Sequence, residues 1–286
     1  MPRIVRVLAP NPGVYTLEGT NTWVLGDGPS IVVDPGPADE RHLAEVAATA
    51  ERVAFVLVTH DHEDHAEGAL AFAERVAAPL HAWRLEGAEP VRDGQRFAVN
   101  GLEAVAVHTP GHSRDHVAFH LPVERALLTG DAVVGRGTSF IDPPDGDLAA
   151  YLSSLARMQQ LHARTILPGH GPVVFDAAAK LAEYVAHRAE REEQVLDGLK
   201  NDSRTVDELV ATIYAAYPPE VRPLAARSVT AHLRKLRSEG RVAASGRGKA
   251  QVWSVVAPRA CARCGRPVRG PGRYCASCSL ALLQDT

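Results

Sequence analysis

The stretch LVTHDHEDHAEGA, residues 57–69, places three histidines and three acids within six positions at the end of an apolar run. Such a run is typical of a buried strand. Removing such polar and charged side chains from water is costly. Their clustering at the end of a strand therefore indicates either a solvated turn or a set of metal ligands. His60 and His62 lie two positions apart and can point to one side of an extended turn. Asp64 and His65 can point to a neighbouring spot, so the stretch predicts ligands for two adjacent metals.

Three further candidate ligands stand just past the ends of other apolar strands. They are His112 after AVAVHTPG, Asp131 after ALLTG and His170 after TILPG. Active-site groups of many α/β folds gather at the carboxyl ends of strands, so the shared position favours one common site. A glycine before each of the two histidines lets the backbone bend close to that site. Asp61 and Glu63, inside the first stretch, are expected to face solvent.

The composition indicates a folded protein with a sizeable core. The 286-residue chain is 45% hydrophobic and has a formal net charge of −3, which favours neither presence nor absence of nucleic acid as a partner. No stretch approaches the roughly 20 apolar residues that span a bilayer. The N-terminus lacks the long apolar core of a secretory signal. We therefore expect a cytoplasmic protein with no membrane partner, of undetermined oligomeric state.

Strand and helix patterns alternate along the first part of the chain. Strand-like runs occur at 22–26, 30–34 and 53–59, and helical composition at 38–50, 66–77 and 147–162. Asn100-Gly101 joins two alternating runs and favours a tight hairpin over 96–109. The alternation predicts an α/β fold with a mixed sheet, in a catalytic domain over 1–185.

The following segment carries a different order of elements. Three helical segments, 175–200, 205–217 and 224–240, precede a strand–turn–strand pattern over 241–256. This order is that of a winged helix, which we expect as a domain over 186–257. Its basic residues are candidate contacts for nucleic acid: Arg227, Arg234, Lys235, Arg237, Arg247 and Lys249. The alternative is a solvated helix that packs as a lid on the catalytic domain.

All four cysteines lie in the remaining tail, 258–286, as two CxxC pairs. Cys261, Cys264, Cys275 and Cys278 have the spacing of a four-thiolate zinc knuckle. We expect one structural Zn²⁺ here rather than disulfides or a redox pair, in keeping with a reducing compartment. The tail is too short to fold alone, so metal binding would order it. It can extend an RNA surface, dock a protein or brace the end of the chain.

Taken together, these motifs resemble the metallo-beta-lactamase superfamily: THDHEDH at 59–65, TPGHS, TGD and PGHG. The resemblance implies an αββα sandwich that binds two metals, usually zinc. The implied ligands are His60, His62 and His112 for the first metal, Asp64, His65 and His170 for the second, and Asp131 as a bridge. Beta-lactamases proper lack a bridging carboxylate of this kind, so hydrolysis of antibiotics is not expected.

The implied chemistry is hydrolysis by a hydroxide held between two metals. Asp64 and Asp131 are the candidate catalytic carboxylates, and Asp64 can also orient the nucleophile. Asp34 resembles a carboxylate that fixes a ligand imidazole, with a turn-starting aspartate as the alternative. His116 and the loop at Asn21 and Thr22 are candidates for supporting the ligands or lining the substrate cleft.

The chain is most similar to the beta-lactamase-like protein 2 family. The similar segments include NPGVYTLEGTNTWVLG at 11–26, VVDPG at 32–36, GHSRDHVAF at 111–119, TGDAVVGRGT at 129–138 and PGHGPVV at 168–174. The animal members of this family are zinc-dependent endoribonucleases, and related fungal polyketide enzymes are thioesterases. The first hypothesis is therefore a metal-dependent endoribonuclease that cleaves single-stranded RNA. The second is a thioesterase or glyoxalase-II-like hydrolase acting on a small thioester. The third is a nucleic-acid-binding regulator that uses the fold as a scaffold. The zinc-ribbon-like tail departs from the family pattern.

Overall fold

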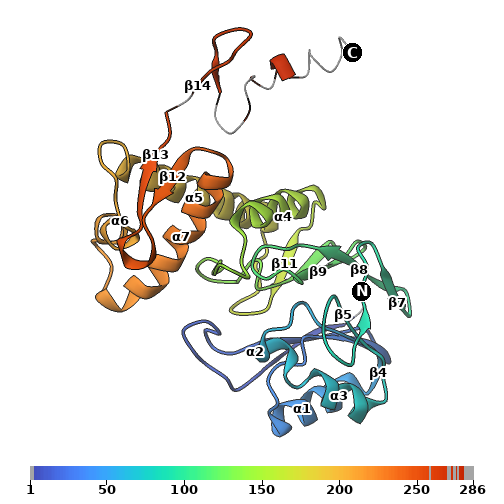
Figure 1. Ribbon diagram of the computed structural model, residues 1–286. Coiled ribbons are helices and arrows are strands. Elements are labelled where there is room, and N and C mark those ends of the chain that lie inside the picture. Colours follow the sequence, from blue (N-terminus) through green and yellow to red (C-terminus); the bar gives the residue numbers. More distant parts are fainter. Residues whose placement is uncertain (1–2, 258, 269–271, 273–274, 276, 280–286) are drawn as a thin grey trace. The chain divides into compact units, whose positions relative to one another are not determined.

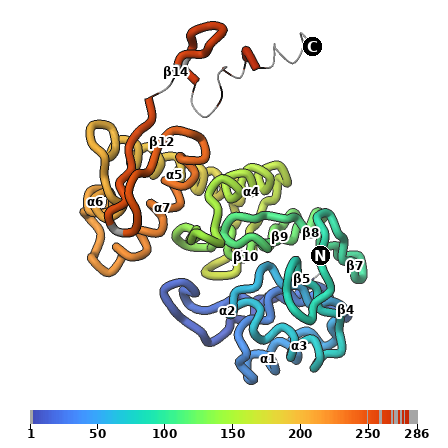
Figure 2. The backbone as a smooth tube through the Cα atoms, viewed as in Figure 1, coloured from blue at the N-terminus to red at the C-terminus, as the bar shows by residue number. Residues whose placement is uncertain are grey.

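The computed structural model of the chain describes residues 3–257, 259–268, 272, 275 and 277–279 (Figures 1 and 2). The chain forms two compact units, Met1–Ala186 and His187–Thr286. Helix α5, Ala177–Gly198, runs from the first unit into the second. Among the helices of the described part, none is long and apolar enough to cross a membrane.

The first unit is built on two sheets. One has the order β1-β2-β3-β4-β5-β6, antiparallel from β1 to β3 and parallel from β3 to β6. Its strands are β1 Ile4–Leu8, β2 Asn21–Leu25, β3 Pro29–Val33, β4 Arg52–Leu57, β5 Leu80–Ala82 and β6 Glu89–Pro90. The other has the order β11-β10-β9-β8-β7, antiparallel except between β10 and β11. Its strands are β7 Arg96–Val99, β8 Leu102–His108, β9 Val117–Leu121, β10 Ala126–Gly130 and β11 Thr165–Pro168.

The two sheets face each other across an apolar core. Leu57 of β4 belongs to the same buried cluster as Phe119 of β9 in the other sheet. A second apolar layer lies between the first sheet and its covering helices. Strand β3 contributes to both layers, because successive side chains of a strand point to opposite faces. Ile31 and Val33 join the cluster between the sheets, whereas Val32 packs on the other face, beneath the helices.

Helices cover the outer faces of both sheets (Figure 1). On the first sheet lie α1, Glu40–Ala50, and α3, Ala69–Val76, through Val46 and Phe72. On the second lies α4, Leu148–Gln160, which buries Tyr151 and Leu155 fully. The short helix α2, Glu63–Ala66, precedes α3. The predicted αββα sandwich is thereby confirmed.

Local sequence signals explain where several elements begin or turn. Asp39 and Asp147 start α1 and α4, because each carboxylate accepts a hydrogen bond from a backbone N–H of the first turn. In the predicted hairpin, Asn100 and Gly101 have φ of 44° and 82° and join β7 to β8. A two-residue primed turn requires these positive values, which Asn and Gly tolerate best.

The second unit has the element order predicted for a winged helix. After α5 come α6, Val206–Ile213, α7, Arg222–Ser238, and the hairpin β12, Val242–Ser245, with β13, Val252–Val255. Short 3₁₀ turns lie at Pro219–Val221 and Gly248–Ala250. A capping box of Thr205 and Glu208 starts α6, with side-chain-to-backbone hydrogen bonds in both directions. Further along are the two-residue strands β14, Arg259–Ala260, and β15, Pro267–Val268.

Candidate metal centre

The segments that follow β4, β8, β10 and β11 meet in one cluster of histidines and aspartates. All seven predicted ligands belong to it. Within each of three groups, one ligand atom per residue lies within 4.8 Å of the others: His60, His62 and His112; His60, His65 and Asp131; and Asp64, His65 and His170. The structure therefore brings the predicted set together at a single place.

The first group is an arrangement of three imidazoles. His60 Nε2 lies 3.0 Å from His62 Nδ1, and His112 Nε2 lies 3.2 Å from the same atom. His62 is the least confined of the three, because it is only half-buried while the other two are buried. The three nitrogens converge on one point from two different loops.

The second group combines two imidazoles with a carboxylate. His65 Nε2 and His170 Nε2 lie 3.1 Å apart. Asp64 Oδ2 lies 3.1 Å from His170 Nε2 and 3.6 Å from His65 Nε2. Both histidines are fully buried, so the carboxylate of Asp64 forms the open side of the group.

Asp131 lies between the two groups. Its Oδ1 is 3.2 Å from His170 Nε2 and 3.4 Å from His65 Nε2. Its Oδ2 faces the first group, 3.8 Å from His112 Nε2. Oδ1 is buried and has no hydrogen-bond partner among the residues that the structure describes. This is the position that a carboxylate bridging two metals requires.

The other ring nitrogen of four histidines is held by the protein. Thr59 Oγ1 contacts His60 Nδ1 at 3.0 Å, and Asp34 Oδ2 contacts His65 Nδ1 at 2.9 Å. Two backbone carbonyls serve the remaining pair: Phe140 O lies 2.8 Å from His112 Nδ1, and Gly19 O lies 3.2 Å from His170 Nδ1. A carbonyl or carboxylate oxygen only accepts, so the Nδ1 atoms of His65, His112 and His170 carry a proton, and Nε2 is the nitrogen that faces the cluster.

The donor set fits a pair of metal ions. Two imidazole nitrogens at 3.0–3.2 Å need a proton between them, and one proton cannot serve three converging nitrogens. Two ligands bound to one tetrahedral zinc at about 2.0–2.1 Å lie about 3.3 Å apart, close to the observed spacing. Mixed nitrogen and carboxylate donors also suit manganese or iron, so the geometry does not distinguish among these metals.

Asp34 supports this cluster as one of the two sequence interpretations predicts. It is buried, and its carboxylate accepts from the Thr59 backbone N–H at 2.7 Å, from Thr59 Oγ1 at 2.8 Å and from His65 Nδ1. The Thr59 hydroxyl gives its proton to Asp34, so its oxygen accepts from His60 Nδ1–H. Asp34 thus orients one histidine directly and a second through Thr59. Nothing in the sequence pattern singled out Thr59.

Asn21 and Thr22 do not line a cleft, which corrects one of the two roles suggested for them. They lie in strand β2 rather than in a loop, and both are fully buried. Asn21 Nδ2 donates to Pro168 O and Gly171 O, both at 2.9 Å, and thereby clamps the turn that carries His170. Thr22 Oγ1 donates to Asp34 O at 2.7 Å. Their positions fit the supporting role.

His116 is also fully buried and cannot contact a substrate. Its Nδ1 lies 2.9 Å from Thr109 Oγ1, and its Nε2 accepts from the Ala132 backbone N–H at 3.3 Å. His116 therefore holds the backbone directly after Asp131. The sequence did not distinguish this role from a cleft position, because both place a histidine near the ligands.

Asp61 and Glu63 are exposed, as the sequence predicts. The backbone N–H of Asp61 donates to Asp115 Oδ2 at 2.9 Å, and Ser113 Oγ donates to Asp115 Oδ1 at 2.6 Å. Asp115 is buried and ties the loop of His60 and His62 to the loop of His112. Asp115 is not among the site residues predicted from the sequence, because its only signal there is that of an acid close to a ligand turn.

Two aromatic side chains, the exposed Tyr15 and the half-buried Phe140, lie in contact beside the cluster. The rings of Tyr15 and Phe140 are 5.7 Å apart, and Phe140 is the residue whose carbonyl holds His112. Tyr15 is 57% exposed, and its neighbour Val14 is 80% exposed. The loop that bears them returns to the cluster at Gly19, whose carbonyl holds His170. Apolar groups exposed next to a polar centre are typical of a binding surface.

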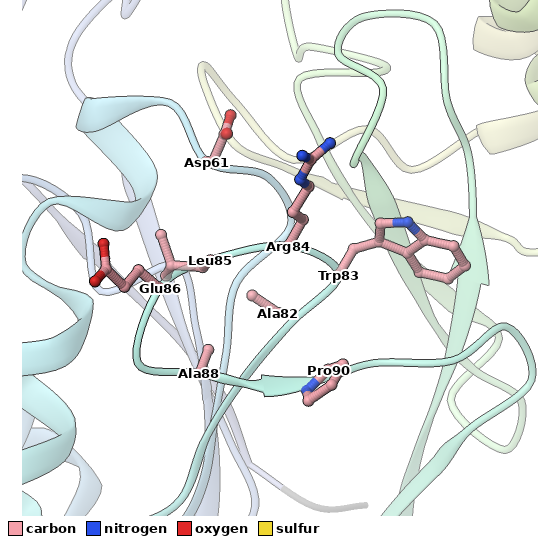
Figure 3. Close-up of a pocket in the computed structure, with 8 residues that line it drawn as sticks. All are labelled: Asp61, Ala82, Trp83, Arg84, Leu85, Glu86, Ala88 and Pro90. Carbon is pink, nitrogen blue, oxygen red and sulfur yellow. The ribbon is translucent and has the colours of Figure 1, made fainter.

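A pocket of about 530 Å³ opens on the side of the ligand loop that carries Asp61 (Figure 3). This volume is within the usual range of small-ligand pockets, about 300–1,000 Å³. Figure 3 shows Asp61 and Arg84 at one rim, with Trp83 extending to the other side. The Trp83 ring stacks on His108 at 3.8 Å. The lining residues are Asp61, Ala82, Trp83, Arg84, Leu85, Glu86, Ala88 and Pro90.

The basic residues predicted to contact nucleic acid fall into two classes. Arg227, Arg234, Arg237 and Arg247 are exposed, and the side chain of Lys249 lies outside the described part of the structure. Lys235 instead pairs with Glu192 at 2.6 Å and with Glu239 at 2.7 Å. Its side chain is 12% exposed. Lys235 is therefore a link within the second unit, which weakens its candidacy as a phosphate contact.

Comparison with known proteins places this cluster in a family. The profile described as the metallo-beta-lactamase superfamily matches residues 15–102 and 80–170, which include all seven clustered side chains. The chain belongs to the metallo-beta-lactamase superfamily. A second profile, the beta-lactamase associated winged helix domain, matches residues 205–253. The chain is thus a hydrolase of that fold with a C-terminal winged helix domain, and the predicted superfamily is confirmed.

Several individual proteins are similar to this chain over most of its length. An atrochrysone carboxyl ACP thioesterase of Aspergillus chevalieri is 37% identical over 276 residues, 90% of this chain and 88% of the relative. A beta-lactamase-like protein 2 homolog of Caenorhabditis elegans is 34% identical over 254 residues, 83% of this chain and 85% of the relative. The structure of a metallo-beta-lactamase family protein of Thermus thermophilus aligns with a TM-score of 0.73 at 25% identity, covering 88% of this chain and 98% of that one.

The charges of neighbouring residues in the cluster shift the pKa values of His170 and Asp131. Burial disfavours the charged form of His170, but Asp131 and Asp64 outweigh it and raise the pKa of His170 to about 9. Burial likewise opposes charge on Asp131, yet His170 and His65 hold the pKa of Asp131 well below its usual range. Without metal, the superfamily cluster therefore keeps a negative carboxylate beside a protonated imidazole at neutral pH.

The affinity for metal is expected to rise with pH. A metal that binds His170 displaces the proton held there, since the ligand is the neutral imidazole. Because the pKa is about 9, the proton is present below that pH and its removal costs progressively less as pH rises toward it. With one displaced proton, the apparent affinity should increase about tenfold per pH unit between roughly pH 7 and 9. Calorimetric titration of metal-free protein in buffers of different ionisation enthalpy measures both the slope and the proton count. A pH-independent affinity contradicts the expectation.

Asp34→Asn is expected to weaken metal binding by about 10- to 100-fold, the usual cost of removing a carboxylate behind a ligand histidine. The amide has only one acceptor oxygen. If that oxygen replaces Oδ2, which accepts from His65 and Thr59 Oγ1, the amide NH2 faces the Thr59 backbone N–H that Oδ1 accepts from in the native protein. Residue 34 has φ of 52°, a region in which asparagine is well tolerated, so the backbone is preserved. Competition with a chelator measures the affinity, and circular dichroism checks the fold. Unchanged affinity in a folded variant would contradict the role assigned to Asp34.

Proposed function

We propose that this hydrolase cleaves a thioester, releasing a carboxylic acid and a thiol by addition of water. The main supporting observation is the exposed ring of Tyr15, which contacts the half-buried ring of Phe140 beside the metal-binding cluster. An apolar wall next to the reacting centre suits an acyl chain, which gains by leaving water. The relative from Aspergillus chevalieri, named as an acyl-carrier-protein thioesterase, supports this substrate class.

We propose that two metals bind the cluster. His60, His62 and His112 would hold one, Asp64, His65 and His170 the other, and Asp131 would contribute to both. When bound, such metals activate water and stabilise the negative charge that develops on the carbonyl oxygen. Zinc is the first choice because the superfamily resemblance implies zinc in most cases, and the ligand spacing is compatible with zinc bond lengths.

The protein's own groups fix the geometry around the reacting carbonyl. The hydrogen bonds to Thr59, Asp34, Phe140 and Gly19 keep four imidazoles in one tautomer and one orientation. The side chain of Asp64 is 27% exposed, against 14% for Asp131. Asp64 is therefore the carboxylate that can orient an incoming water, while Asp131 stays confined between the groups.

Cleavage of single-stranded RNA is the second candidate, although the sequence alone favours it first. Arg234, Arg237 and Arg247 are exposed on the winged helix domain and can contact phosphates. The relative from Caenorhabditis elegans supports this candidate through its family name. Pairing of Lys235 with two glutamates reduces the basic surface and lowers RNA cleavage to second place. A regulator that uses the fold as a scaffold has less support, since it would not need a complete ligand set.

A parallel assay tests the order of these candidates. Metal-loaded protein is incubated with acyl-CoA and acyl-glutathione thioesters of several chain lengths and, separately, with unstructured RNA. We expect thioester turnover that His62→Ala abolishes. RNA cleavage that disappears with His62→Ala, without thioester turnover, would overturn the proposal in favour of the second candidate. Absence of any metal-dependent turnover would favour the scaffold.

A pair of variants at Tyr15 tests the apolar wall. Tyr15→Ala should raise KM for a long-chain thioester about tenfold, because burial of an aromatic side chain is worth roughly 1.5–3 kcal/mol. The matched control Tyr15→Phe keeps the ring and should leave KM unchanged. Equal KM values for all three proteins on long and short chains would show that the acyl group lies elsewhere.

A further inference from the structure

A second group of candidate metal ligands, the four cysteines of the tail, takes no part in the proposed hydrolysis. Cys261, Cys264, Cys275 and Cys278 have sulfur atoms that all lie within 4.8 Å of one another. Neither matched family profile reaches this segment, since the winged helix match ends at residue 253. The cluster therefore calls for an explanation separate from hydrolysis.

Backbone turns bring the first two cysteines to one side of a knuckle. The Cys261 N–H donates to Arg266 O at 2.7 Å, and the Gly265 N–H donates to Cys261 O at 2.9 Å. Gly265 has φ of 73°, which lets the chain reverse directly after Cys264. Strands β14 and β15 then pair on either side of this turn. The CxxC spacing thus becomes a tight loop whose thiols share one face.

The sulfur geometry fits a metal and does not fit a disulfide. Cys264 Sγ and Cys275 Sγ lie 3.6 Å apart, whereas a disulfide bond measures about 2.05 Å. Two thiolates bound to one tetrahedral zinc at about 2.3 Å lie about 3.8 Å apart. All four cysteines are free. In addition, the Cys275 N–H donates to Cys261 Sγ at 3.3 Å, an interaction that stabilises a thiolate.

The described part of this segment has little else to hold it together. Its strands are two residues long, and Cys261 and Val268 are its buried side chains among those described. So small a core does not stabilise a fold, whereas a structural zinc supplies the required free energy. We propose that Cys261, Cys264, Cys275 and Cys278 bind one structural Zn²⁺, which folds this segment and is distinct from the metals of the His/Asp cluster.

Metal content of the full-length protein tests this site. We expect three metals per chain in the unaltered protein and two in the double variant Cys264→Ser/Cys278→Ser. The control Ser277→Ala, an exposed neighbour of Cys278, should keep three. Retention of the two remaining metals by the double variant serves as its folding control. Three metals in that variant would overturn the proposal.

Cobalt substitution and proteolysis give independent readouts. Co²⁺ bound by four thiolates should show intense sulfur-to-metal charge-transfer absorption, which the double variant loses and which His62→Ala retains. Chelation or the double variant should also make residues 258–279 sensitive to protease. Absence of the thiolate band in cobalt-loaded protein, or disulfide-bonded cysteines by mass spectrometry of the metal-loaded protein, would overturn the site.

Discussion

Asp131→Asn is expected to lower kcat/KM by about 1,000-fold and to reduce the metal content of the His/Asp cluster. Asp131 faces both groups, through Oδ1 toward His65 and His170 and through Oδ2 toward His112. The amide has the same shape but carries no charge and presents a donor where the carboxylate presented an acceptor. A loss of several kcal/mol of charge stabilisation corresponds to about this factor. Steady-state kinetics on the substrate found in the parallel assay, with metal analysis of the same sample, measures both effects.

Glu63→Gln is the matched control for that variant. Glu63 is an exposed acid inside the same HxHxDH stretch, so the change removes a similar charge at a site that faces solvent. It should retain both metals and its activity. Equal losses in the two variants would mean that net charge near the cluster, rather than the bridging position, accounts for the effect.

Gly169→Ala is expected to lower activity by about 100-fold, because a displacement of about 1 Å at a reacting centre costs this much. A Cβ on residue 169 would lie 2.7 Å from His65 Cε1 and 2.9 Å from Asp131 Oδ1. Both atoms belong to the cluster, so the added methyl must push ligands apart. Metal analysis and steady-state kinetics on one preparation measure the outcome.

Gly101→Ala is the control that separates displacement of the ligands from the backbone strain of placing alanine at a glycine position. Residue 101 lies in the turn between β7 and β8, where nothing stands within 4 Å of an added Cβ. Its φ of 82° disfavours alanine, so the variant should lose roughly 1 kcal/mol of stability and keep its metals and activity. A fully active Gly169→Ala protein would contradict the close packing found around the ligands.

The clustered candidate ligands were predictable because each leaves a local signal. Metal-binding side chains of this kind are His, Asp or Glu, and they follow buried strands that position them. Metal binding explains a run as dense as His60 to His65 better than a solvated turn does. The same holds for Cys261 and Cys264, since two thiols at this spacing suit a knuckle.

The supports of those ligands were only partly predictable. Phe140 and Gly19 act through backbone carbonyls, which every residue possesses, so no sequence pattern can mark them. Asn21 and His116 were recognised as candidates, but burial decided that they hold backbone rather than substrate. Lys235 was counted with the basic residues of the winged helix until its pairing with Glu192 appeared.

The fold class, the clustered ligands and the zinc-binding spacing of the tail all follow from the order of amino acids. These features depend on periodicity and on residue type over short distances, which the linear chain displays directly. Folding in three dimensions was needed to establish which nitrogen of each histidine faces the cluster and that Asp131 stands between the two groups. It was also needed to bring Tyr15 against Phe140 beside His112. Each of these contacts joins residues far apart in the chain, and only packing of the two sheets fixes the distances between them.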